Sequence, residues 1–179
     1  MVTGPMDELR ARIRNIPDFP KKGIVFRDIT TLLQDRAAFH EANDCFSNRY
    51  SNSGIEKVVS IESRGFIFGS VLAFRLGAGF VPVRKPNKLP SATIREEYQL
   101  EYGTDALEIH TDAIKPGEQV LVIDDLLATG GTARATCSLV RRLGGRIAGA
   151  AFLIELAFLK GREKLKEYEV FSVITYDGE

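Results

Sequence analysis

The sequence predicts an α/β fold with a mostly parallel sheet, and three observations support this class. Short runs of β-favouring apolar residues alternate with longer segments whose apolar residues recur every three or four positions. The 179 residues fit one domain, without repeats, low-complexity tracts or an interdomain linker. The composition, 44% hydrophobic and 27% charged, is ordinary for a globular protein. We therefore expect a single domain over residues 1–179.

The first half of the chain is predicted to alternate helices with extended segments. Pro17 and Pro20 end the first helix, and Asp35 is a suitable N-cap for the second. In chain order, we expect a helix over residues 6–16, an extended segment over 24–30, a helix from Asp35 to about 50, a strand over 57–61, a helix over 65–76 and a strand over 80–84.

The second half begins with a break in the pattern. Residues 85–103 combine charged residues with two prolines and show weak periodicity, which indicates a long loop with a functional role. Gly144 and Gly145 stop the helix that precedes them. In chain order, we expect strands over 107–109 and 119–123, a helix over 131–143, a strand over 146–154, a short helix over 160–168 and a strand over 170–175.

Charge and cysteine content limit the possible partners and location. Lys plus Arg and Asp plus Glu both number 24, so we expect no nucleic acid and no membrane surface as partner. No apolar stretch reaches the ~18–20 residues of a membrane span, and residues 1–5 lack the apolar core of a secretion signal. Cys45 and Cys137 are far apart and fit no metal-ligand spacing, which suits a reducing, cytoplasmic location.

The most informative segment is residues 120–132. Four apolar, β-favouring residues lead into Asp124 and Asp125, and a loop of small residues then opens directly into a helix. Ligands of open α/β sheets bind at the carboxyl ends of strands, where this loop is expected. The loop residues are Ala128, Thr129, Gly130, Gly131 and Thr132.

These residue types suit a ribose 5-phosphate. Gly130 and Gly131 allow the backbone close to a ligand, and the start of the following helix favours a dianionic phosphate. Asp124 and Asp125 can accept hydrogen bonds from a vicinal diol and can reach a magnesium ion or its waters. The segment lacks the lysine of a Walker loop and the spacing of a dinucleotide fingerprint. The plainer alternative is that the aspartates only cap a turn.

The same segment resembles the phosphoribosyl-diphosphate-binding motif of the type I phosphoribosyltransferases. Further segments, in the family's order, are similar to its adenine-specific members. They are residues 19–28, 62–66, 83–85, 88–90 and 100–103. The resemblance implies a mostly parallel five-stranded sheet flanked by helices, with a small N-terminal hood at about 6–34 and a flexible loop at about 85–103.

The resemblance also implies a reaction, which is the transfer of a 5-phosphoribosyl group from 5-phosphoribosyl-1-diphosphate to adenine. The products are AMP and pyrophosphate, so the reaction serves purine salvage. The implied cofactor is Mg²⁺, held mainly through the substrate rather than by direct protein ligands. The family usually works as a homodimer, which the composition does not test.

Departure of pyrophosphate from the ribose builds cationic character on the sugar and leaves a polyanion, so the site requires cations more than a proton donor. Arg64, Lys85 and Lys88 are the candidate cations, and the backbone around Ser63 can also face the pyrophosphate. For the two lysines, the alternative is a solvated loop.

Further roles follow from the resemblance. Glu101 is the candidate acid–base residue acting at N7 of adenine, and Tyr102 beside it either covers the pyrophosphate site or simply packs. Read without the family motif, a glutamate in a polar loop is ordinary surface charge. The residues implied to bind adenine, through backbone groups and apolar contact, are Val25, Phe26, Arg27 and Leu126.

Two rival functions remain. One is a phosphoribosyltransferase for another 6-substituted or 6-oxopurine. Glu101 argues against it, because 6-oxopurine enzymes of this fold typically place an aspartate inside the phosphate loop, where Ala128 or its neighbours stand here. The other is a regulatory protein that senses phosphoribosyl diphosphate without catalysis, and such proteins normally add a nucleic-acid-binding region. The chain has neither spare length nor a basic excess for such a region.

Overall fold

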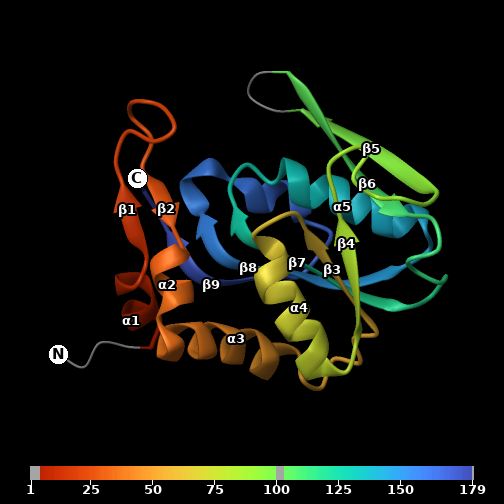
Figure 1. Cartoon of the computed structure of the whole chain (residues 1–179), viewed down its shortest axis with the longest axis horizontal. Helices are drawn as coiled ribbons and strands as arrows, with labels where there is room; N and C mark the ends of the chain where they lie inside the picture. Colours follow the sequence, from red (N-terminus) through yellow and green to blue (C-terminus); the bar gives the residue numbers. More distant parts are fainter. Residues whose placement is uncertain (1–4, 100–102, 179) are drawn as a thin grey trace.

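The computed structural model describes residues 5–99 and 103–178, and its centre is a five-stranded sheet (Figure 1). Every strand pair in this sheet is parallel, which confirms the expected α/β class. In spatial order the strands are β4 (Gly79–Val83), β3 (Lys57–Ile61), β7 (Gln119–Leu127), β8 (Arg146–Leu156) and β9 (Val170–Tyr176).

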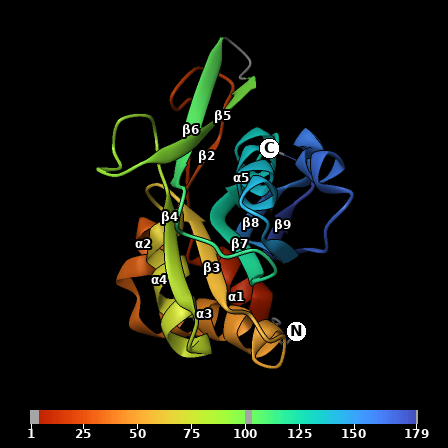
Figure 2. The same ribbon diagram turned by 90° about the vertical axis from the view of Figure 1, so that its right-hand side faces the viewer.

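Helices cover both faces of this sheet (Figure 2). Alternate side chains of β7 enter two separate cores, because successive side chains of a strand point to opposite faces. Leu121 and Ile123 pack with α3 (Arg36–Tyr50) and α4 (Gly65–Leu76). Val120 and Val122 pack with α5 (Gly131–Arg142). Burial on both faces explains the continuous apolar run of this strand.

The predicted ends of two helices are confirmed. The Asp35 carboxylate accepts hydrogen bonds from the backbone N–H of Ala37 at 2.9 Å and of Ala38 at 3.1 Å, and so caps α3. Helix α4 ends at Gly77, which adopts a left-handed conformation with φ of 65°. Among the described residues, no helix is both long enough and apolar enough to cross a membrane.

The N-terminal hood differs from the expectation. The helix predicted over 6–16 is wrong in its last turn, because α1 (Pro5–Ala11) stops early and residues 14–16 form strand β1 (Arg14–Ile16). This strand pairs antiparallel with β2 (Phe26–Asp28), and α2 (Thr30–Gln34), which was not expected, follows. The Arg14 guanidinium holds the pKa of Asp28 down at about 2 and fixes this pairing.

Residues 85–99 also have more regular structure than predicted. Residues 93–99 form β5 (Thr93–Gln99), which pairs antiparallel with β6 (Thr104–His110), and the predicted strand 107–109 is only part of β6. Charged residues on the exposed face of β5 hid its alternation in the sequence. The hood and this hairpin stand on either side of the sheet (Figure 1).

The short helix predicted over 160–168 is wrong. Two 3₁₀ turns replace it, η1 (Ala157–Leu159) and η2 (Gly161–Leu165), separated by Lys160 in a left-handed conformation with φ of 55°. Such short turns are set by neighbouring structure rather than by helix propensity, so their path depends on contacts with the rest of the fold.

Candidate active site

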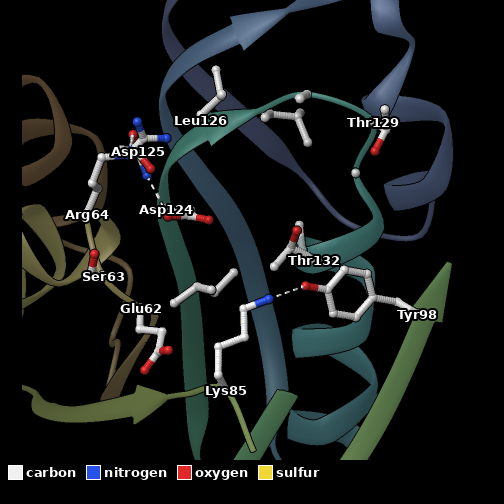
Figure 3. A pocket seen from close by; sticks show the side chains of 15 residues that line it. Glu62, Ser63, Arg64, Lys85, Tyr98, Asp124, Asp125, Leu126, Thr129 and Thr132 are labelled. Carbon is white, nitrogen blue, oxygen red and sulfur yellow. Dashed lines mark hydrogen bonds and ion pairs between the residues drawn. The ribbon is translucent and has the colours of Figure 1, made fainter. Parts of the chain in front are cut away.

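An open pocket of about 420 Å³ lies at the carboxyl ends of β3 and β7 (Figure 3). It is bounded by the β3–α4 turn, the β7–α5 loop and one side chain of β5. The residues that line it are Ile61, Glu62, Ser63, Arg64, Lys85, Tyr98, Asp124, Asp125, Leu126, Leu127, Ala128, Thr129, Gly130, Thr132 and Ala133. Most of the side chains expected to bind the phosphoribosyl and pyrophosphate groups therefore share one pocket.

The β7–α5 loop has the backbone conformation that the sequence predicts. Gly130 is the N-cap of α5 and has φ of 75°, a conformation in which a side chain would be strained. A Cβ on Gly130 would also overlap the carbonyl oxygen of Gly161 and lie 3.1 Å from its carbonyl carbon. The N–H groups of the first turn, which starts at Gly131, lack partners within the helix and can bind an anion.

The two aspartates lie within β7, and their side chains diverge. Asp125 is 5% exposed and forms an ion pair with Arg64, with Nε to Oδ2 at 2.8 Å. The Asp124 carboxylate points toward the pocket and accepts a hydrogen bond from the backbone N–H of Asp125 at 2.9 Å (Figure 3). Only Asp124 therefore keeps its carboxylate turned to a ligand.

Burial shapes the charge of both groups. Burial, with the Asp125 carboxylate next to it, raises the pKa of Asp124 well above its usual range. Burial also raises the pKa of Asp125, and the Arg64 guanidinium opposes that rise. A carboxylate with a raised pKa destabilises the folded state at neutral pH, which is typical of a side chain kept for binding.

Replacing Asp124 with asparagine should therefore stabilise the ligand-free protein. A carboxyl whose pKa is higher in the folded than in the unfolded state takes stability away as pH rises from the unfolded pKa, near 3.8, through the folded value. Asparagine does not titrate and can still accept the hydrogen bond from Asp125. Melting temperatures from pH 4 to 8 should show an advantage of Asp124→Asn that grows with pH. A variant less stable than wild type at pH 8 would contradict the raised pKa.

The β3–α4 turn forms the second wall of the pocket. A Cβ on Gly65, the first residue of α4, would lie 2.6 Å from Oδ1 of Asp124, so the two walls touch through a residue without a side chain. Glu62 also lines the pocket and is ion-paired with Arg84, with Nε to Oε2 at 2.6 Å. Ser63 and Arg64 line the pocket as expected, and Arg64 is held there by Asp125.

Lys85 enters the pocket from the opposite side. Its ammonium is ion-paired with Asp105 and donates to the Tyr98 hydroxyl at 2.9 Å (Figure 3). Burial lowers the pKa of Lys85, but the hydrogen bonds to Asp105 and Tyr98 outweigh this effect and the net pKa is raised. The lysine is thus a fixed cation at neutral pH. Lys88, in contrast, is exposed and does not line the pocket.

Sequence reasoning missed Tyr98 and Asp105. Both belong to the hairpin of β5 and β6, and they are brought together by a strand register in which Tyr98 is paired with Asp105. The only signal in the sequence was the placement of Ile94 and Tyr98 an even number of residues apart, which fits one face of a strand. The expected residues Glu101 and Tyr102 lie outside the described residues. The hairpin brings Gln99 close to the β7–α5 loop, since its carbonyl oxygen would be 3.5 Å from a Cβ on Gly131.

The residues expected to bind adenine are divided between the hood and the pocket. Leu126 lines the pocket, whereas Val25, Phe26 and Arg27 belong to the hood. The hood approaches the pocket where the Arg64 guanidinium carbon lies 5.4 Å from the centre of the Phe26 ring. In the part of the chain that the structure describes, β2 pairs with β1 alone, so its other edge has backbone groups for a planar base.

The Arg27 side chain is directed elsewhere. Its guanidinium carbon lies 4.1 Å from the centre of the Tyr176 ring, and Nη1 donates to Asn15 at 2.6 Å. Any contact of Arg27 with a base would therefore involve its backbone.

Comparison with known proteins identifies the family. A model described as a phosphoribosyl transferase domain matches residues 28–178. The adenine phosphoribosyltransferase of Geobacter metallireducens is 60% identical over 171 residues, which cover 96% of this chain and 100% of that protein. The chain belongs to the adenine phosphoribosyltransferases. A further relative with that name, from Chloroflexus aurantiacus, is 60% identical over 169 residues, covering 94% of this chain and 98% of the relative.

Solved structures of adenine phosphoribosyltransferases share the fold. The one from Thermoanaerobacter pseudethanolicus is 51% identical with a TM-score of 0.93, covering 96% of this chain and 99% of that one. The one from Saccharomyces cerevisiae, complexed with D-2,5-dideoxy-2,5-imino-altritol 1,6-bisphosphate and adenine, is 40% identical with a TM-score of 0.90, covering 95% and 98%. The type I phosphoribosyltransferase fold and the transfer of a phosphoribosyl group to adenine, both expected from the sequence, are confirmed.

Proposed function

We propose that this pocket binds 5-phosphoribosyl-1-diphosphate and transfers its phosphoribosyl group to adenine, giving AMP and pyrophosphate. One observation carries this assignment. The glycine-rich loop, the paired aspartates and a cationic wall lie around one cavity, beside a hood strand with an unpaired edge among the described residues. This arrangement provides for every group of the two substrates: a 5-phosphate, a sugar diol, a polyanionic leaving group and a planar base.

The loop residues Ala128 to Thr132 receive the 5-phosphate in this proposal. The helix dipole and the unpaired N–H groups stabilise the dianion, and Thr129 and Thr132 add hydroxyl donors. Asp124 accepts from the ribose hydroxyls, because its carboxylate faces the cavity. Asp125 keeps Arg64 in place and reaches the diol only if that ion pair loosens.

Arg64 and Lys85 stabilise the departing pyrophosphate from two sides of the pocket. Ser63 contributes from the turn between them, and Lys88 and Tyr102 are proposed to join when the segment 85–103 closes. As the bond to pyrophosphate breaks, positive charge develops on the sugar, and Asp124 is placed to offset it. N9 of adenine then attacks the sugar carbon that pyrophosphate leaves.

Backbone groups of Val25 and Arg27 orient adenine on the free edge of β2, with Phe26 and Leu126 in contact with its faces. Glu101 is proposed to accept the proton from N7–H of adenine as N9 bonds to the sugar, which makes N9 a better nucleophile and leaves the base of AMP neutral.

The residues of the pocket fit a magnesium ion that arrives with its substrate. No group of three or more His, Cys, Asp or Glu side chains gathers as a metal site within residues 5–99 and 103–178. Asp124 has one carboxylate that faces the pocket, which suits a single direct or water-mediated contact with the magnesium ion. Diphosphate oxygens would supply most of the coordination, and the ion would neutralise charge on the leaving group.

One assay tests the proposal. Purified protein, magnesium and 5-phosphoribosyl-1-diphosphate are incubated separately with adenine, hypoxanthine and guanine, and the nucleoside monophosphate formed is measured. We expect AMP from adenine and little product from the other bases. Formation of IMP or GMP at a comparable rate would favour the 6-oxopurine rival. Binding of the diphosphate without any product would favour a sensor.

The segment 85–103 is proposed to move when substrate binds. Lys85 is paired with Asp105 and Tyr98 of the hairpin, so it must exchange these partners to reach a pyrophosphate. Closure would then exclude water from the reacting bond. Limited proteolysis should cut this segment in the free protein, and 5-phosphoribosyl-1-diphosphate with magnesium should protect it. Equal cleavage rates with and without ligand would contradict the movement.

A homodimer and a cytoplasmic location complete the proposal. A subunit interface is supported by two phenylalanines on α4 and β4, Phe74 at 87% exposed and Phe80 at 37%. Sedimentation velocity should show a dimer, and a monomer at every concentration would contradict it.

The cytoplasmic location, a reducing compartment, is supported by the free thiols of Cys45 and Cys137.

A further inference from the structure

The back of the phosphate loop rests on the backbone of η2. A Cβ on Gly161 would overlap the carbonyl oxygen of Ala128 and lie 3.0 Å from the backbone nitrogen of Gly130. A Cβ on Gly130 would in turn overlap the Gly161 carbonyl oxygen. No side chain separates the two segments, so a shift of residue 161 must displace the loop or open a gap behind it.

The residue after Gly161 is anchored by a buried carboxylate. Arg162 binds Glu155 with two parallel hydrogen bonds, from Nε to Oε1 at 2.9 Å and from Nη2 to Oε2 at 2.5 Å. The Glu155 side chain is only 6% exposed and also accepts from the Ser172 hydroxyl at 2.7 Å. Arg162 Nη1 donates to the carbonyl oxygen of Val170 at 2.8 Å. Residue 162 is thus tied to both β8 and β9.

The position of Glu155 in the sheet connects this anchor to the site. Its Cα is the register partner of Leu127, the last residue of β7 before the phosphate loop. The hydrogen bonds from Arg162 lower the pKa of Glu155, so the carboxylate stays ionised at neutral pH. Only the Glu155 side of this ion pair is buried, since the Arg162 side chain is 49% exposed. Desolvation of the carboxylate offsets much of the attraction, but the paired hydrogen bonds can still fix one geometry.

We propose that Glu155 and Arg162 are positioning residues for phosphoribosyl binding, which hold Gly161 against Ala128 and Gly130 so that the loop N–H groups are set before ligand arrives. The proposal rests on the assignment of residues 128–132 to the 5-phosphate. It assigns a role to a segment outside the pocket and predicts that the anchor acts on the sugar phosphate rather than on pyrophosphate, whose cations come from the β3–α4 turn and Lys85.

The test uses the full chain and three variants, with affinities for ribose 5-phosphate and for pyrophosphate with magnesium measured by calorimetry. Arg162→Lys keeps the charge but loses the paired geometry, and Glu155→Gln removes the charge. Both should weaken ribose 5-phosphate binding by roughly 10- to 100-fold, the scale expected for a small displacement of a preorganised site. Pyrophosphate affinity should be unchanged. Gly161→Ala should give the same selective loss with the ion pair intact.

Glu167→Gln is the matched control, because it removes a nearby Arg141–Glu167 ion pair of 2.8 Å that is exposed on both sides. It should leave both affinities unchanged. A merely structural role would lower the melting temperature of the three variants and either spare both affinities or reduce them equally, and either result would overturn the proposal. If Gly130→Val no longer binds ribose 5-phosphate but the three variants bind it as wild type does, the positioning role is wrong while the site assignment stands. If wild-type protein does not bind ribose 5-phosphate, the site assignment itself is wrong, and the positioning role fails with it.

Discussion

Glu101→Gln is expected to lower the single-turnover rate of AMP formation by roughly 10²–10⁴-fold, equivalent to about 3–5 kcal/mol of transition-state stabilisation. Glutamine keeps the size and a hydrogen-bond acceptor but cannot take a proton from N7 of adenine. Binding of 5-phosphoribosyl-1-diphosphate should change little, because the phosphate loop and Asp124 remain. Single-turnover rates are the proper measurement, since slow product release can hide a chemical defect in steady state.

The double variant Asp124→Asn, Asp125→Asn provides the contrast. It should weaken binding of 5-phosphoribosyl-1-diphosphate, because it removes the carboxylate that faces the ribose and releases Arg64 from its ion pair. If the single-turnover rate of Glu101→Gln is close to that of wild type, Glu101 is an ordinary surface charge and not the acid–base residue. That result would also reopen the question of which base the enzyme uses.

Gly130→Val is expected to abolish measurable binding of AMP. Two physical effects act together at this position. The φ of 75° strains any β-branched residue, and the added Cβ would overlap the carbonyl oxygen of Gly161. The loop must therefore move away from η2, which withdraws its N–H groups from the phosphate. Because the clash is with backbone, we also expect a lower melting temperature, and calorimetry with AMP should be done below it.

Gly117→Val is the matched control for conformational strain. Gly117 has φ of 90°, but nothing lies within 4 Å of the position of its Cβ. This variant should lose stability through the same backbone strain and keep its AMP affinity. If Gly130→Val keeps its AMP affinity, the assignment of the 5-phosphate to this loop is wrong.

The sequence by itself determined the class of the fold and the backbone conformation of the β7–α5 loop. Strand β7 is buried on both faces, so its apolar run was visible without any knowledge of its neighbours. Asp35 and Gly130 are local signals, because a cap or a left-handed residue depends on few neighbours. The same locality keeps Asp124 and Asp125 beside the β7–α5 loop in the folded chain.

Only the tertiary structure decided which residues far apart in the sequence come into contact. Residues 14–16 follow a helical stripe in the sequence but become a strand, because Phe26 to Asp28 supply a partner and Asp28 an ion pair. Strand β5 exists through its register with β6, which also creates the Lys85–Tyr98–Asp105 contact. The path of η2 depends on Glu155 and on a backbone contact with the phosphate loop. Propensity acts over a few residues, whereas these pairings join positions that only folding brings together.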